Sequence, residues 1–154
     1  MLILVLAACG SAAAPKPAAA ATTFVGYKWT VVRIAHGGKT TPVPAGDGVY
    51  LLFAPNGDFG ANEPVNYHGG TYTVTPGGFT THGIYQTLVG SSGPPSVEVE
   101  AISAFGDGTR ASAKVGGDTL TVTVNGYTLT TRRAGKQANF PPPRQTSAPP
   151  PTAG

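Results

Sequence analysis

Cysteine is almost absent from this sequence: Cys9 is the single example in 154 residues. With one thiol, no disulfide can form within the chain. Long-chain helix formers are also scarce, whereas Thr, Val and Tyr are plentiful, which favours strands over helices. The 22 glycines and 15 prolines indicate many turns. These features predict a β-rich domain.

Charge is scarce as well, at 11% of the residues, whereas a typical soluble domain has about a quarter. The net charge is only +3. Several basic residues cluster late, in or beside a proline-rich tail, and we interpret them as a solvated end of the chain. They are Arg132, Arg133, Lys136 and Arg144. We therefore expect no nucleic-acid partner.

The first nine residues, MLILVLAAC, have the character of a targeting segment. Leu6-Ala7-Ala8-Cys9 resembles the lipobox of bacterial lipoproteins, in which the cysteine sulfur receives a diacylglyceryl group. The apolar run is short and has no basic residue before it, as a start upstream of Met1 would explain. We predict that residues 1–9 are a lipoprotein signal peptide and that Cys9 is lipidated. The alternatives are a chance resemblance and a short buried apolar terminus.

Two segments have the composition of linkers. Residues 10–22 are rich in Ala and Pro, and residues 135–154 contain two runs of three prolines. Such sequences cannot build a core, so we predict a spacer and a disordered tail. The tail could also dock on a partner that recognises polyproline helices. The folded domain is expected to occupy residues 23–134.

Alternating apolar residues and turn signals divide this domain into short strands. The segment Val49 to Phe53 is apolar on both faces, which indicates a central strand. Asn56-Gly57 follows it and predicts a hairpin with a type I′ turn. Asn125-Gly126 predicts a second one, in which Val122 pairs with Leu129 on the apolar face.

Residues 96–105 are ambiguous from their pattern. Val97, Val99 and Ala101 alternate with glutamates, as in a strand. Ser96 is a good helix N-cap, however, and the apolar residues also share a helical face. The sequence as a whole predicts a mainly β fold: a small antiparallel barrel or sandwich of about 8–9 short strands with at most one helix.

Several short motifs occur in a characteristic order along the domain. They are Trp29, Phe53 with Gly57 and Gly60, Val65-Asn66, Gly70-Thr71-Tyr72, Thr87 to Gly90, the acidic segment 98–105, and Gly117-Asp118-Thr119-Leu120-Thr121-Val122. Together they resemble the META-domain (HslJ-like) family of bacterial envelope lipoproteins over roughly residues 24–132. The resemblance favours a helix near 96–105, and it brings no established catalytic residues.

The chain departs from the family at two cysteines that resemble a disulfide pair. Val65 and Gly90 stand in their places, or Val89 if the alignment shifts by one residue. The resemblance implies that these positions remain close, with Cα atoms within about 7 Å.

Residues capable of catalysis or metal binding are few. His36, His68 and His82 lack the spacing of a helical zinc site, and His68 and His82 flank turns, which favours surface loop positions. Asp58 and Glu63 could in principle form a carboxylate pair. Gly90-Ser91-Ser92-Gly93 is not a hydrolase nucleophile elbow, and Gly106-Asp107-Gly108 is too short for a calcium loop.

Five aromatic residues could either fill the core or line a ligand cup. They are Tyr50, Tyr67, Tyr72, Phe79 and Tyr85. Filling the core is the interpretation we favour in a domain of this size.

The sequence therefore predicts a monomeric, non-catalytic envelope domain with an interaction or stress role. It would be anchored by lipid to the outer face of the bacterial cytoplasmic membrane or to the outer membrane. We expect no cofactor and no metal, and an envelope protein is the expected partner. The alternative is a lipocalin-like binder of a small apolar ligand, which needs an interior cavity of about 300 Å³ or more. A hydrolase is the least supported class.

Overall fold

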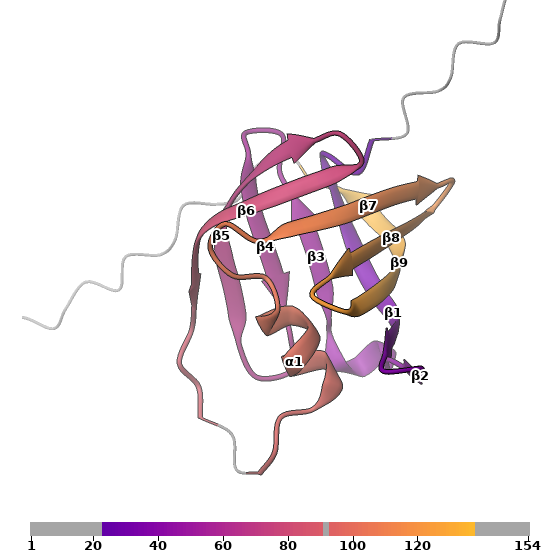
Figure 1. Ribbon diagram of the computed structural model, residues 1–154, viewed down its shortest axis with the longest axis vertical. Coiled ribbons are helices and arrows are strands. Elements are labelled where there is room, and N and C mark those ends of the chain that lie inside the picture. The colour runs from indigo at the N-terminus through magenta and orange to yellow at the C-terminus, as the bar shows by residue number, and fades with distance from the viewer. Residues whose placement is uncertain (1–22, 91–92, 138–154) are drawn as a thin grey trace, which may run out of the picture.

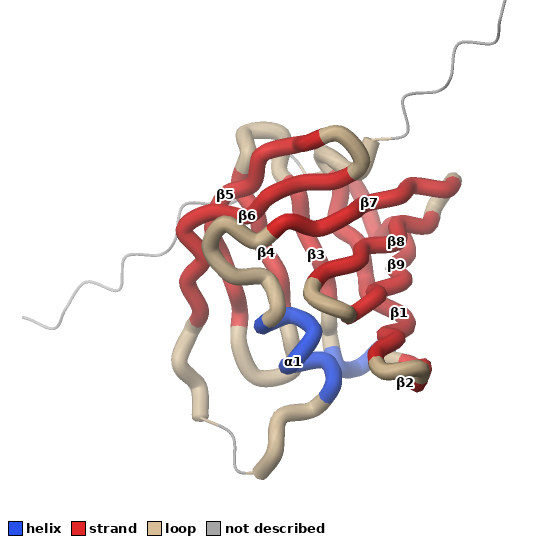
Figure 2. The backbone as a smooth tube through the Cα atoms, in the orientation of Figure 1, coloured by secondary structure: helices blue, strands red, loops and turns tan. Residues whose placement is uncertain are grey.

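The computed structural model describes residues 23–90 and 93–137, which form a closed antiparallel barrel with a short helix at one end (Figures 1 and 2). The predicted mainly β fold with one short helix is therefore confirmed. Cys9, the 10–22 linker and most of the 135–154 tail lie outside the described residues, so the predictions made for them stay predictions.

Eight strands form the barrel, and the pairing of β9 with β1 closes it. A ninth strand, β2 (Lys39–Pro42), pairs with the end of β1 and is followed by a 3₁₀ turn at Ala45–Asp47. In order around the barrel the strands are β1 (Tyr27–His36), β3 (Tyr50–Phe53), β4 (Asp58–Asn62), β5 (Tyr67–Thr75), β6 (Gly78–Gln86), β7 (Arg110–Gly116), β8 (Thr119–Val124) and β9 (Tyr127–Lys136).

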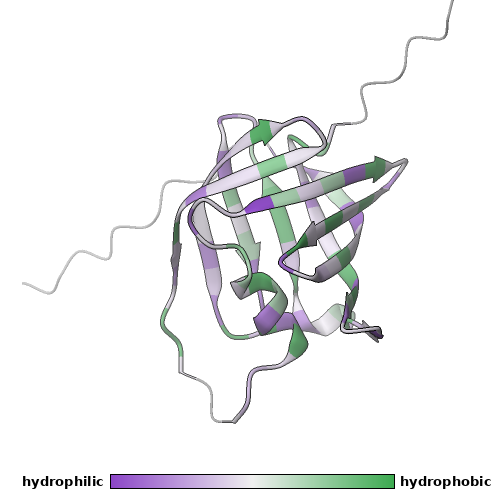
Figure 3. Cartoon of the chain, viewed as in Figure 1, coloured by the Kyte–Doolittle hydropathy of each residue, from purple (hydrophilic) through white to green (hydrophobic). Residues whose placement is uncertain are grey.

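The interior of the barrel is filled by side chains. Six aromatic rings form a connected cluster with centroid separations from 4.8 to 6.4 Å. Figure 3 shows the alternation of hydrophobic and hydrophilic residues along the strands that directs such side chains inward. The clustered rings belong to Phe24, Phe53, Phe59, Tyr72, Phe79 and Phe105.

The ambiguous segment forms a helix, α1 (Val97–Ser103), across the barrel end that holds the β8–β9 turn (Figure 1). The hydroxyl of Ser96 caps it by accepting from the N–H of Val99 at 3.5 Å. Ala101 and Ile102 are buried in the core. The Asn125 side chain donates to the carbonyl of Ala104 at 3.0 Å, which ties the helix to the β8–β9 turn.

The β8–β9 hairpin has the predicted register and turn. Asn125 has φ 44° and Gly126 has φ 84°, as a type I′ turn requires. Val122 pairs with Leu129, and both side chains are fully buried. The local sequence is therefore sufficient to define this hairpin.

The turn between β3 and β4 is of a different type from the one predicted. The N–H of Gly57 donates to the carbonyl of Ala54 at 3.1 Å, so Pro55 and Asn56 are the central residues. Gly57 has φ 91°, whereas Asn56 is not in the left-handed region. Proline fixes φ near −65°, which suits the first central position of a type I turn and excludes a type I′ turn there. Central placement of β3, between β1 and β4, is confirmed.

Arg133 is not part of a solvated end, contrary to the sequence interpretation. Its guanidinium carbon lies 4.4 Å from the ring centre of Tyr27 and 5.2 Å from that of Trp29. It also donates to the carbonyl of Gly117 at 3.0 Å. Register places Arg133 opposite Trp29, where a cation over two aromatic faces is stabilising.

Candidate functional site

Three tyrosines lie on the outer face of β3, β5 and β6 rather than in the core. We call Tyr50, Tyr67 and Tyr85, with the strand surface between them, the tyrosine surface. Tyr50 pairs with Asn62, which pairs in turn with Tyr67, so these three residues form one cross-strand row on the outside. Tyr85 stands in the adjacent row, opposite Gly69.

A β-bulge in β6 directs Tyr85 outward. Between the pairs Gly69–Tyr85 and Thr71–His82, β5 advances by two residues and β6 by three. The extra residue is accommodated at Gly83, whose φ is 56°. Its N–H donates to the carboxylate of Asp107 at 2.7 Å. Without this insertion the alternation along β6 would turn Tyr85 towards the core.

A second row on the outer face lies beside the first and has small and apolar residues at its centre. Lys28, Leu52, Gly60, Gly69 and Tyr85 follow one another across five strands. Leu52 is only 4% exposed although it lies outside the core cluster, so neighbouring outer side chains cover it. The Tyr85 ring occupies the space that a Cβ of Gly69 would need, so it lies against the strand, yet Tyr85 remains 54% exposed.

Polar groups also lie on this surface. The pKa of Tyr67 is raised, first by burial and then by the neighbouring Tyr85, Tyr50 and Asp58. The ammonium of Lys28 lies 4.0 Å from the centre of the Tyr50 ring. The other two aromatic candidates, Tyr72 and Phe79, belong to the core, where Tyr72 donates to the carbonyl of Ala54 at 2.8 Å. The core interpretation therefore holds for these two residues only.

Glu63 and His68 form a buried pair at the β4–β5 connection, and both are 2% exposed. Nε2 of His68 lies 3.8 Å from Oε1 of Glu63, and Oε2 accepts from the N–H of Val65 at 2.6 Å. Burial lowers the pKa of His68, and Glu63 acts in the opposite direction. The predicted surface-loop position of His68 is wrong.

This position could have been read from the sequence, because Tyr72, Gly70 and His68 share the inward phase of β5. The turn signal beside His68 favoured a loop, but His68 is the second residue of a strand that begins at Tyr67.

Asn66 fixes the chain that leaves β6. Its Oδ1 accepts from the N–H of Val89 at 2.8 Å and from the Thr87 hydroxyl at 3.2 Å, and its Nδ2 donates to the carbonyl of Val89 at 3.3 Å. Asn66 lies next to Val65, and Val89 next to Gly90. The two positions where the family resemblance implied a disulfide are thus brought to one corner of the domain.

The remaining candidates do not assemble into a reactive site. Asp58 and Glu63 stand at opposite ends of β4, about 16 Å apart along the strand. His36 stacks on Tyr127 with ring centres 4.0 Å apart, and His82 contacts the Thr73 hydroxyl at 3.3 Å. Among the described residues, no three His, Cys, Asp or Glu side chains gather as a metal site would require.

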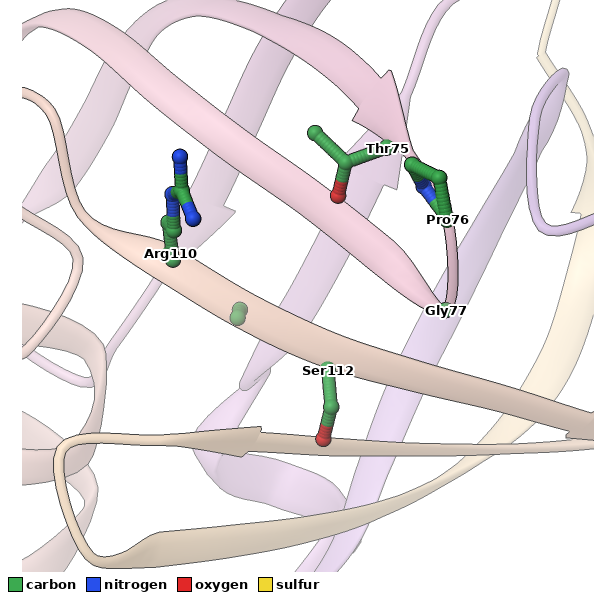
Figure 4. A pocket seen from close by; sticks show the side chains of 6 residues that line it. Thr75, Pro76, Gly77, Arg110 and Ser112 are labelled. Atoms are coloured by element: carbon green, nitrogen blue, oxygen red, sulfur yellow. The ribbon is translucent and has the colours of Figure 1, made fainter.

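An open groove of about 380 Å³ lies beside the β5–β6 turn (Figure 4). Thr75, Pro76 and Gly77 come from this turn, and Arg110 and Ser112 come from the neighbouring strand β7. Its volume reaches the range of ligand sites. It lies on the outside of the barrel, however, and does not provide the interior cavity that a lipocalin-like binder needs.

Comparison with known proteins identifies a family and a similar structure. The META domain matches residues 22–136. No curated protein matches the chain. An NMR structure of a protein from Burkholderia xenovorans is similar, with a TM-score of 0.59 and 19% sequence identity over 86% of this chain and 100% of that one. At this identity the likeness shows a shared fold. Within the described ranges, no helix is long and apolar enough to cross a bilayer.

Proposed function

The chain belongs to the META domain family, and from this premise we propose that it is a non-catalytic domain of the bacterial cell envelope. A lipid on Cys9 would hold it to a membrane, and the barrel would act by binding an envelope component. The observation that carries this proposal is the division of the aromatic residues. Rings fill the barrel interior, while three tyrosines are displayed together on its outer face.

The packed interior favours an interaction domain over a lipocalin-like carrier. The six clustered rings occupy the space where a carrier would hold its ligand. A hydrolase is disfavoured as well, because the buried Glu63 is committed to the N–H of Val65 and its partner His68 is equally buried. Binding is therefore expected at the outside of the barrel.

The membrane anchor is tested by a Cys9→Ser variant expressed with the native upstream sequence. Each buried CH₂ of a lipid contributes about 0.8 kcal/mol, and two or more acyl chains suffice for stable anchoring. The wild type should sediment with membranes, and the variant should be recovered in the soluble fraction. A Cys9→Ser protein that fractionates with membranes as the wild type does would overturn the anchor.

A further inference from the structure

We propose that the tyrosine surface is a binding site for an uncharged, hydroxyl-rich saccharide chain. This inference rests on the proposed envelope function, because a domain exposed there meets glycans as neighbours. The argument itself comes from three features of the surface: an exposed ring, a group of polar side chains and a balance of charge.

The Tyr85 ring provides a stacking platform. It lies against the backbone of Gly69, and Tyr85 is 54% exposed. The face of an aromatic ring carries negative charge density, which attracts the weakly positive C–H groups of a sugar ring. The bulge at Gly83 and its bond to Asp107 hold the ring on the outside. The platform is therefore part of the fold rather than a mobile side chain on a loop.

Polar atoms next to the platform suit the hydroxyl groups of a sugar. Tyr50, Asn62 and Tyr67 form one cross-strand row on the outer face, Tyr85 stands in the adjacent row, and Asp58 lies further along β4 on the same face. A phenol both donates and accepts hydrogen bonds, and a carboxylate accepts. Neighbouring donors and acceptors are what sugar hydroxyls need, because each hydroxyl both donates and accepts.

The charge and extent of the surface narrow the class of ligand. By register, Lys28 and Asp58 carry opposite charges on the same outer face, so the surface selects neither a polyanion nor a polycation. From β3 to β6 there are three strand spacings of about 4.8 Å each, or roughly 14 Å in all. This extent suits a chain of several sugars better than a single ring.

The experiment uses the full chain carrying Cys9→Ser, labelled with ¹⁵N, and titrated with cellohexaose or chitohexaose. Binding of at least one oligosaccharide should shift the amide signals of Gly60, Gly69 and Tyr85. Tyr85→Ala should weaken that binding about tenfold or more. Val74→Ala is the matched control, since Val74 lies on the same hairpin and is 56% exposed, and it should bind as the parent does.

A second variant separates the position of the ring from its presence. In Gly69→Ala the new methyl group overlaps the Tyr85 ring and must displace it, while every tyrosine is retained. We expect this variant to lose affinity as Tyr85→Ala does, with an unchanged fold by circular dichroism.

Three outcomes would overturn the proposal: no shift with either oligosaccharide at millimolar concentration, shifts confined to β7–β9, or equal binding by Tyr85→Ala. Shifts of the same amides by a proline-rich peptide alone would assign the surface to a polypeptide instead. None of these results bears on the Cys9→Ser fractionation, so the envelope proposal and the saccharide proposal can fail separately.

Discussion

The β8–β9 hairpin and the β5–β6 hairpin differ in how completely their strands are paired. β8 and β9 are paired on both sides along their length, with β7 and β1 as outer neighbours. β6 pairs with β7 over only three residue pairs, from Gly78 to Thr80. Gly78 permits this contact, because a Cβ there would overlap the carbonyl oxygen of Ala111.

We call β8–β9 the regular hairpin, because no register shift interrupts the pairing of its two strands, and β5–β6 the irregular hairpin, because a bulge interrupts theirs. In β8–β9 the inward residues fill the core and the outward ones are mostly threonines. In β5–β6 a bulge, two adjacent glycines and a short outer ladder leave room for the exposed Tyr85 and the buried His68. The hairpin with the weaker local signal carries the unusual side chains.

The largest effect is expected from a core truncation in the regular hairpin. Leu129→Ala should lower the free energy of unfolding by about 2–5 kcal/mol, because it removes a fully buried side chain from a packed barrel. Ile84→Ala, the corresponding change in the irregular hairpin, should cost no more than about 1.5 kcal/mol, since Ile84 is only partly buried against the core. Chemical denaturation of both variants measures the difference.

The control for this pair is Thr128→Ala, which changes an outward residue next to Leu129 and should stay within about 0.5 kcal/mol of the wild type. The two hairpins would not differ in their contribution to stability if Leu129→Ala lowers the free energy of unfolding by less than about 1 kcal/mol. The same conclusion would follow if Ile84→Ala lowers it by as much as Leu129→Ala does.

The sequence predicted the turn and the register correctly where local residues alone determine them, as in the β8–β9 hairpin. Asn125-Gly126 favours positive φ at both positions, and the alternation on each side sets the register. The β3–β4 turn was misassigned because Pro55, just before Asn56-Gly57, determines the turn. The helix at Val97–Ser103 needed the family resemblance, since its pattern fits a strand equally well.

The tyrosine surface was beyond sequence reasoning for a specific reason. Its orientation depends on one extra residue at Gly83, and the bulge is held by Asp107, which is 24 residues away in the chain. No periodicity shows such an insertion, because the same residues without it would place Tyr85 inside.

The second prediction is that a disulfide can be introduced between the chain before β5 and the chain after β6, at the open end of the irregular hairpin. Val65→Cys combined with Gly90→Cys, in a Cys9→Ser background, should form a disulfide under mild oxidation. The Asn66–Val89 hydrogen bonds bring the two positions to one corner, and Gly90 neither has a positive φ nor lacks space for a side chain. A loop of roughly 25 residues corresponds to about 3 kcal/mol of stabilisation.

Thermal unfolding with and without reductant measures this gain within one protein. Val65→Cys with Val89→Cys is the matched alternative, since the family alignment allows either position. Thiols that remain free in both double variants would show that these positions do not have the geometry of a disulfide, contrary to what the family resemblance implies.

The smallest effect concerns His68, which lies in β5 and is buried beside Glu63. Burial lowers the pKa of His68 below its usual value of about 6.5, so the unfolded chain binds a proton at a pH where the folded chain does not. The contribution of His68 to stability is fully present above its unfolded-state pKa of about 6.5. It is lost as the pH falls from there towards the lowered pKa of the folded state. Stability should therefore fall between pH 7 and pH 5.5, by at most about 1.4 kcal/mol per pH unit for a single proton. His68→Gln should flatten this part of the stability curve, because the variant has no imidazole to protonate. The slope is the informative quantity, because His68→Gln can lower stability at every pH through packing alone. Parallel curves for the wild type and His68→Gln would mean that protonation of this histidine is not coupled to folding.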